Sequence, residues 1–472
     1  MNEEKDMLGK EPVGRLLLKL ALPTVTAQVI NMLYNIVDRI YIGHIPGVGA
    51  AALTGVGVCM PLIMIVTAFA AFIGYGGAPR ASIFMGKGDH ASAEKTLGNC
   101  FTAQIVISAV LTAVLLLWNR DFLMAFGASE NTIEYGVSYM NIYSIGTLFV
   151  QLTLGMNAFI TAQGFAKTGM LSVLIGAVAN IILDPIFMFA FDMGVQGAAL
   201  ATILSQAMSC AWVLAFLFGK KTRLKIRREN LILKSRIILP SLALGLSSFI
   251  MQASESVIFV CFNSSLLKYG GDIAVGAMTI LTSVMQFAML PLQGLGQGAQ
   301  PIISYNYGAR NADRVRAAFK ILLKVSLGYS ITLWALIMLF PQGFAAMFTD
   351  TPALIEFTKT ALRIYAACLL LFGIQIACQM TFTSLGNAKA SILVAVMRKF
   401  ILLIPLIYIL PAIFTQAQTT AVYAAEPVAD FLAVSFTAVL FTFQFRKSLA
   451  GLPGGDGTEP VLPEENTPPA SL

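Results

Sequence analysis

Apolar residues in this chain run in long blocks, each long enough to cross a lipid bilayer. A helix needs about 20 predominantly apolar residues to span the hydrocarbon core. Hydrophobic residues make up 57% of the 472 residues and charged residues only 12%, whereas roughly a quarter of the residues in a soluble domain are charged. A water-soluble fold could not cover so much apolar surface. The sequence therefore predicts an all-α membrane protein.

Gly, Pro and charged residues divide the apolar sequence into twelve predicted transmembrane helices. The first six are expected at 16–43, 50–77, 95–118, 134–160, 168–191 and 195–218. The second six are expected at 237–266, 273–300, 317–341, 354–384, 390–413 and 420–445. This division predicts an N-terminal lobe (1–218), a basic cytoplasmic linker (219–236), a C-terminal lobe (237–447) and a cytoplasmic tail (448–472). The tail is rich in Pro, Gly and Glu, and we expect it to be disordered.

The basic residues indicate the orientation of these helices. Lys and Arg accumulate on the cytoplasmic side of membrane proteins. With both termini cytoplasmic, the only Lys and Arg on or near the outer side are Arg39, Arg120, Lys268, Lys359 and Arg363, and all others belong to inner loops and flanks. The N-terminus lacks the apolar core of a signal peptide. We therefore predict a multi-pass plasma-membrane protein, expected to be a monomer. Its net charge is +7, and we expect the basic residues to face anionic lipid head groups rather than to bind a nucleic acid.

The two predicted halves repeat one plan. Leu22-Pro23 and Leu239-Pro240 start the first helix of each half, and the spacing between them also carries Asp38 onto Glu255. Further along, at a slightly longer spacing, the stretch APRASIFMG aligns with QPIISYNYG, Tyr143 aligns with Tyr365, and AQGFAK aligns with SLGNAK. An even number of helices per half makes this a parallel repeat about an axis along the membrane normal. The predicted fold is two pseudo-twofold-related six-helix bundles, an architecture typical of alternating access.

Ionisable residues inside the membrane are the strongest functional candidates, because burying them in hydrocarbon costs at least a few kcal/mol. Asp38 lies in the outer part of the first helix. Asn180 and Asp184 are four residues apart in the fifth, so they share a helix face, and Thr202 lies at a similar depth in the sixth. These oxygen donors could bind H⁺ or Na⁺. The alternative is a hydrogen-bonded cluster that only holds helices together.

The acids of the second half are harder to interpret. Glu255 is the pseudo-mate of Asp38, and it could attract a cationic substrate, carry a proton or pair with a basic residue. Glu426 and Asp430 are four residues apart, and Arg398 lies far enough into its helix to pair with Asp430. A structural ion pair is our interpretation of these three. Few other basic residues lie away from the predicted loops.

Candidate substrate contacts lie on the first and seventh helices. Asn31, Tyr34 and Asn35 are within about two turns of Asp38 on the same helix. Met251 and Gln252 precede Glu255 by about one turn, and Met residues recur in the first, second, seventh and eighth helices. Flexible thioethers suit a pocket for varied apolar shapes, although at helical spacing such residues more often pack or face lipid.

Three stretches resemble the multidrug and toxic compound extrusion (MATE) transporters. They are LPTVTAQVINMLYNIVDRIYIGH in the first helix, GYGGAPRASIFMGKGDHASAEK after the second, and NIILDPIFMFAFDMGVQGAALATILSQ across the fifth and sixth. The sequence looks most like the MepA-type members of the DinF-like grouping, over residues 10–447. The resemblance implies cation-coupled antiport, with H⁺ or Na⁺ exchanged for amphipathic, often cationic drugs. It also implies an N-lobe cation site whose residues match Asp38, Asn180, Asp184 and Thr202 here.

One departure from the family concerns the second half. NorM-like members carry an aspartate in the tenth helix that partners the glutamate of the seventh. Here that stretch reads LLLFGIQIACQMTFTSLG, with Gln375 but no acid. The resemblance therefore assigns ion coupling to the first half and leaves Glu255 without that partner.

Three other functions are alternatives to drug efflux. A flippase for a lipid-linked precursor would share the fold, but we expect it to line its cavity with basic residues. An enzyme would need a His, Cys or acid constellation with nucleophile or metal spacing, and none is evident, so we predict no enzyme activity, no cofactor and no metal beyond a Na⁺ at the acid cluster. A receptor or scaffold would not need duplicated halves and buried acids.

Overall fold

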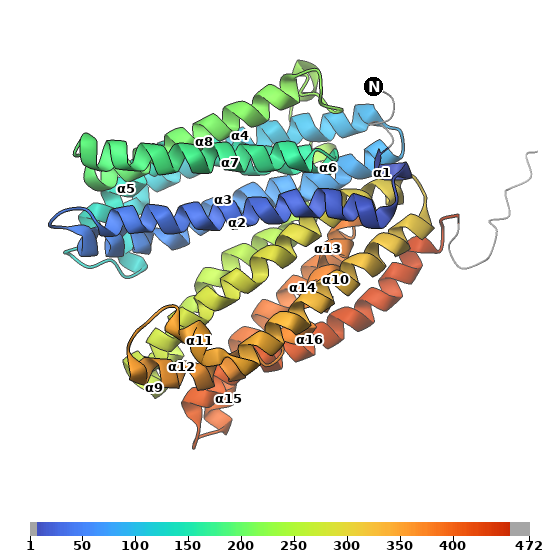
Figure 1. The fold of residues 1–472 in the computed structure, drawn as a ribbon. Helices are drawn as coiled ribbons and strands as arrows, with labels where there is room; N and C mark the ends of the chain where they lie inside the picture. The colour runs from blue at the N-terminus through green and yellow to red at the C-terminus, as the bar shows by residue number, and fades with distance from the viewer. Residues whose placement is uncertain (1–6, 454–472) are drawn as a thin grey trace, which may run out of the picture.

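The computed structural model describes residues 7–453, and most of them are helical. A short helix, α1 (Met7–Lys10), precedes the first long one. The helices before residue 219 form one lobe, drawn from blue to green in Figure 1, and those from 235 onward form the other, drawn from yellow-green to red. The first lobe contains α2 (Val13–Gly43), α3 (Gly49–Gly86), α4 (His90–Ala125), α5 (Ile133–Ile145), α6 (Thr147–Ala162), α7 (Ala166–Pro185), a π turn η2 (Ile186–Ala190) and α8 (Gly194–Phe218).

The second lobe begins with a helical hairpin, α9 (Ser235–Gly308). Gly271, at φ +66°, interrupts its helical geometry, a backbone conformation that glycine adopts without a Cβ clash. The elements that follow are α10 (Ala312–Leu339), α11 (Pro341–Ala346), α12 (Pro352–Tyr365), η4 (Leu369–Leu371), α13 (Phe372–Ser384), α14 (Ala388–Val396), a π turn η5 (Met397–Leu403), α15 (Ile404–Ile413) and α16 (Gln418–Leu449). A short η3 (Arg228–Asn230) lies in the connection between the lobes.

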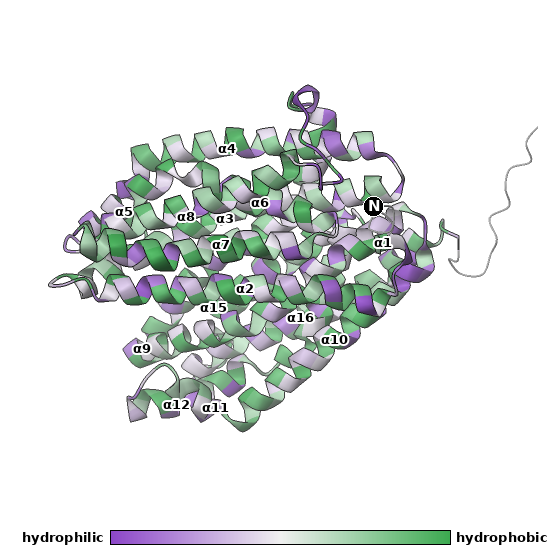
Figure 2. Ribbon diagram, turned by 45° about the horizontal axis from the view of Figure 1, so that its top comes forward, coloured by the Kyte–Doolittle hydropathy of each residue, from purple (hydrophilic) through white to green (hydrophobic). Residues whose placement is uncertain are grey.

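Nine helices of the described chain are long and apolar enough to cross a membrane, and two bent pairs raise the number to 11. Because α9 is two helices joined at Gly271, residues 7–453 contain the twelve predicted helices. Figure 2 shows hydrophobic residues along the helices and hydrophilic ones gathered at their ends. The predicted boundaries differ most at the second helix, which continues as α3 through Pro79 to Gly86 instead of ending at residue 77. Of the tail predicted at 448–472, Ser448 and Leu449 still belong to α16, which corrects its start, and the part from residue 454 lies outside the described residues, as do residues 1–6.

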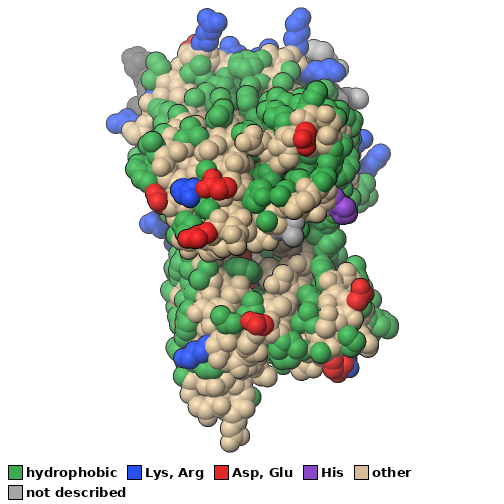
Figure 3. All heavy atoms as spheres, turned by 90° about the vertical axis from the view of Figure 1, so that its left-hand side faces the viewer, with side chains coloured by type: hydrophobic (Ala, Val, Ile, Leu, Met, Phe, Trp, Pro, Cys, Tyr) green, Lys and Arg blue, Asp and Glu red, His purple; other side chains and the backbone are tan. Residues whose placement is uncertain are grey.

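The two lobes touch at one end and part at the other (Figure 1). The end where they meet also holds α1 and the last turn of α16; we call it the closed end and the opposite one the open end. Figure 3 looks at the open end, where a groove separates the lobes. A hydrophobic core drawn from both lobes fills the closed end, and it includes Leu16, Leu20, Ile302 and Leu322.

Backbone contacts at the closed end follow the sequence repeat. A Cβ on Gly86 would collide with the carbonyl oxygen of Tyr305, and a Cβ on Gly308 would collide with that of Ile83. The sequence repeat makes Gly86 equivalent to Gly308 and Ile83 equivalent to Tyr305. The two contacts are therefore equivalent to each other under the pseudo-twofold symmetry. The helices therefore cross on the pseudo-twofold axis with no room for a side chain. Thr24 adds a hydrogen bond of 2.6 Å from its hydroxyl to the carbonyl of Gly294.

Candidate functional site

The predicted acid cluster of the first lobe lies between α2 and α7, toward the open end. Asp184 is fully buried, and Asn180 is 1% exposed. The amide of Asn180 donates to Oδ1 of Asp184 over 3.2 Å, which the four-residue spacing predicts. The carboxyl group of Asp38 lies within hydrogen-bonding reach of that of Asp184. The sequence prediction that α2 and α7 bring these three side chains together therefore agrees with the geometry.

A hydrogen bond between two carboxyl groups requires a proton on one of them. Two ionised carboxylates about 4 Å apart would repel by about 4 kcal/mol at an effective dielectric constant of ~20. Without such a proton, Oδ1 of Asp38, Oδ1 of Asn180 and Oδ2 of Asp184 are all buried with no hydrogen-bond partner. Three unpartnered oxygens around one carboxyl pair form a cluster of acceptors that a proton or a small hard cation can satisfy.

Thr202 lies beside this cluster rather than in contact with its acids. Its hydroxyl is within hydrogen-bonding reach of Tyr139, a buried tyrosine of α5 that feels the charge of Asp38. Tyr139 stacks on Tyr143, with ring centroids 6.1 Å apart. Tyr139 is not among the site residues predicted from sequence. Its spacing of four from Tyr143 on one helix face was the available signal.

Of the three predicted substrate contacts of α2, one lies beside the same acids. Tyr34 is within hydrogen-bonding reach of Asn35 and of Gln206 on α8, and it feels the charges of both acids. The amide of Asn35 donates to the carbonyl of Asn31 over 2.6 Å. Asn31 itself is exposed. Tyr34 therefore belongs to the wall of the acid cluster, whereas Asn35 bonds to its own helix.

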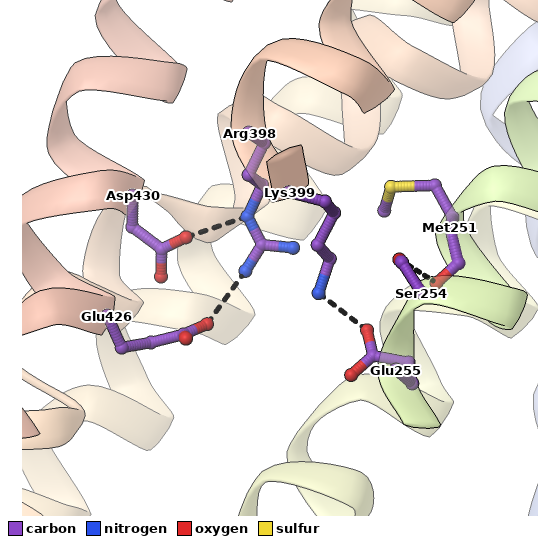
Figure 4. Close-up of polar contacts among 7 residues, drawn as sticks. All are labelled: Met251, Ser254, Glu255, Arg398, Lys399, Glu426 and Asp430. Carbon is purple, nitrogen blue, oxygen red and sulfur yellow. Dashed lines mark hydrogen bonds and ion pairs between the residues drawn. The ribbon is translucent and has the colours of Figure 1, made fainter. Parts of the chain in front are cut away.

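In the second lobe, Glu255 pairs with a base (Figure 4). Nζ of Lys399 lies 2.6 Å from Oε1 of Glu255. The side chain of Lys399 is 3% exposed, whereas that of Glu255 is 47% exposed. Three roles were open for Glu255: attracting a cationic substrate, carrying a proton or pairing with a basic residue. The structure shows the third, the ion pair with Lys399. Met251 and Gln252 are half-buried about one turn earlier on α9.

One sequence prediction about basic residues was wrong. The distribution of basic residues predicts Lys399 and Arg398 in the cytoplasmic flanks, but both are buried within the second lobe, 3% and 5% exposed. They lie in the π turn η5, which interrupts the 3.6-residue period. These two are among the few bases that lie away from the predicted loops.

Arg398 makes the ion pair predicted for it, and a second one besides. Its Nε lies 2.7 Å from Oδ1 of Asp430, and its Nη2 lies 3.1 Å from Oε1 of Glu426. Tyr365, the pseudo-mate of Tyr143, feels the charges of these acids and of Glu255. Each lobe thus carries a pair of ionisable side chains between its first and fifth helices, with a tyrosine beside the pair. The pair is acid with acid in the first lobe and acid with base in the second.

One family of known proteins matches both lobes. The MatE family model matches residues 23–186 and 247–409, one stretch in each lobe. The chain is 24% identical over 419 residues to the multidrug export protein MepA of Staphylococcus aureus strain N315, covering 88% of this chain and 90% of that protein. It is 22% identical to MepA of Staphylococcus haemolyticus over 92% of this chain and 95% of the other.

Solved structures share the fold at low sequence identity. A MATE protein in its bent conformation aligns with a TM-score of 0.88 and 22% identity, over 94% of this chain and 98% of that one. A transporter of the MOP superfamily from Pyrococcus furiosus, described as having a binding pocket of reversed polarity, aligns with a TM-score of 0.86 and 22% identity, over 94% and 98%. Among residues 7–453, no group of three or more His, Cys, Asp or Glu could hold a metal ion. The chain belongs to the MatE family, a family of multi-pass membrane transporters rather than enzymes.

Proposed function

We propose that the chain exports amphipathic, cationic small molecules in exchange for H⁺ by alternating access, with both termini cytoplasmic. The observation that carries the proposal is the carboxyl pair formed by the half-buried Asp38 and the fully buried Asp184, held beside Asn180. The relatives named as multidrug export proteins support the substrate class. In the proposed orientation the open end faces outward, so the groove between the lobes is where substrate leaves.

The charges of both lobes favour a cationic substrate. The first lobe places Asp38 and Asp184 near the open end, and the second places three carboxylates against two bases. A flippase for an anionic lipid precursor would need a net positive cavity. Lys399 and Arg398 do not provide one, because carboxylates already neutralise both.

The proposed cycle uses the acid pair as a carrier. Substrate enters from the cytoplasm while the pair is ionised, and negative charge near the groove stabilises it. After the lobes reopen outward, a proton from outside binds between Asp38 and Asp184, which removes that charge and weakens substrate binding. The protonated pair then favours the return. Na⁺ is the second candidate, because three buried oxygens without partners could coordinate it.

Efflux from proteoliposomes tests the proposal. Ethidium movement is measured under an imposed pH gradient and, separately, under an imposed Na⁺ gradient. Asp38→Asn keeps the shape of the side chain but removes the shared proton, and we expect it to abolish coupled efflux while the protein stays folded. Asp192→Asn is the matched control, because Asp192 lies in the α7–α8 connection at φ +53°, a conformation that Asn also tolerates. Continued pumping by Asp38→Asn against a gradient would refute the mechanism.

A further inference from the structure

The Arg398–Glu426–Asp430 triad holds one more negative than positive charge. Arg398, Glu426 and Asp430 are 5%, 6% and 4% exposed, and the guanidinium contacts one oxygen of each carboxylate. Oε2 of Glu426 is buried without a hydrogen-bond partner. A buried carboxylate without full compensation binds a proton or a second cation, because leaving it charged costs several kcal/mol.

The groups facing Glu426 come from four elements. Asp430 shares its helix α16, Arg398 and Lys399 face it from η5, and Glu255 faces it from α9. Tyr365 on α12, a neutral group, feels its charge. Lys399 is therefore the available second cation, but Glu255 already engages its ammonium at 2.6 Å. While that pair is closed, Lys399 cannot compensate Glu426, and a proton on Glu426 is what removes the excess negative charge of the triad.

The two bases differ in their freedom to move. Arg398 is held by two carboxylates and lies over the ring of Phe372, 4.7 Å from its centroid. Lys399 has a flexible four-carbon stem and a compact ammonium. Its partner Glu255 is 47% exposed, so that carboxylate is accessible to a cation from outside the lobe. Lys399 is thus the element that can exchange partners.

We propose that Glu426 is a second proton-binding site of this transporter, and that a cationic substrate bound to Glu255 releases its proton. The substrate displaces the ammonium of Lys399 from Glu255. The positive charge of Lys399 then stabilises the ionised form of Glu426. The O–H bond of Glu426 breaks, and the proton passes to water. Before the exchange, Glu255, Lys399, Arg398, Asp430 and a protonated Glu426 sum to zero charge. Afterwards the ionised Glu426 and the bound cation again sum to zero, so no net charge is buried.

This inference rests on the proposed cationic substrate but not on the N-lobe acid pair. The test therefore uses full-length Asp38→Asn protein in detergent, in which the first site is silent. Tetraphenylphosphonium is titrated by calorimetry in buffers of different ionisation enthalpy, which gives affinity and protons released together. We expect release of about one proton per bound cation, with affinity rising about tenfold per pH unit where Glu426 titrates.

Two further variants in that background locate the proton. Glu426→Gln should bind the cation without releasing a proton. Lys399→Met should also release none, and it should bind more tightly because Glu255 no longer has an internal partner; a purely structural role would not tighten binding. Glu356→Gln, an exposed surface carboxylate paired with Lys359, is the control and should release protons as its parent does.

The outcomes separate this inference from the proposed function. Equal proton release with and without Glu426→Gln overturns the inference and leaves the proposed function intact. If Glu426→Gln does not fold, full release by the Lys399→Met variant overturns it by itself. Loss of binding in Asp38→Asn protein, with binding kept by the wild type, also counts against it, because Glu255 would not be the binding group. Failure of the wild type to bind the cation overturns the proposed substrate class.

Discussion

The crossing of Gly86 and Gly308 at the closed end predicts a conformational effect of adding one methyl group. In Gly86→Ala the new Cβ would meet the carbonyl of Tyr305 and lie 2.9 Å from the backbone nitrogen of Ala309. Ordinary van der Waals contact begins at 3.4 Å, so the two helix backbones must move apart. Neither partner is a side chain that can rotate away.

The size of the effect follows from overpacking. Inserting a methylene into a tight contact typically costs about 1–3 kcal/mol, and this clash exists only while the closed end is sealed. The mutation should therefore favour the state in which the closed end has opened by a factor of roughly 5–150. Because the sequence repeat exchanges the two contacts, Gly308→Ala should have a similar effect.

Distances across the groove measure this shift. Spin labels at Glu130 and Asp350, exposed residues at the open end of different lobes, report whether the groove narrows, in a background without the native cysteines. We expect the shorter distance to gain population in Gly86→Ala and Gly308→Ala. Gly57→Ala is the control, since a Cβ at that position has nothing within 4 Å. An unchanged distribution in Gly86→Ala, or the same change in Gly57→Ala, would refute the reasoning.

Two further substitutions test contacts made by arginines of the second lobe. Arg398→Met leaves the buried carboxylate of Asp430 without its cation, and we expect about 3–5 kcal/mol of destabilisation, against about 0–1 kcal/mol for Lys359→Met at the surface; comparable losses in thermal unfolding of the two would contradict this. Arg314→Gln removes the hydrogen bonds from Nη2 to the carbonyls of Leu8 and Glu11, so trypsin should cut the N-terminal segment faster, while the overall unfolding temperature changes little. Unchanged cleavage would show that these bonds do not hold α1.

The sequence by itself determined the membrane class, the twelve helices and the pseudo-twofold repeat. These follow from the lengths of apolar runs and from spacings along one chain, which are local properties. It also placed Asp38, Asn180 and Asp184 in one site, because burial cost singles out the acids and four-residue spacing joins two of them. The match of the family model to a stretch in each lobe agrees with that repeat.

The tertiary structure decided the charge balance of the second lobe. The basic-residue distribution counts Lys399 among the flanking bases, and on a regular α-helix a residue that follows an inward-facing Arg398 points about 100° away from it. The π turn η5 turns both toward the interior, and hydrophobic periodicity cannot predict a π turn. The sequence also could not predict that the lobes pack backbone against backbone at Gly86 and Gly308. A glycine in a sequence gives no information about which distant carbonyl lies against it. Both the charge balance of the second lobe and the glycine crossing depend on which distant helices pack together. They are therefore seen only in the tertiary structure.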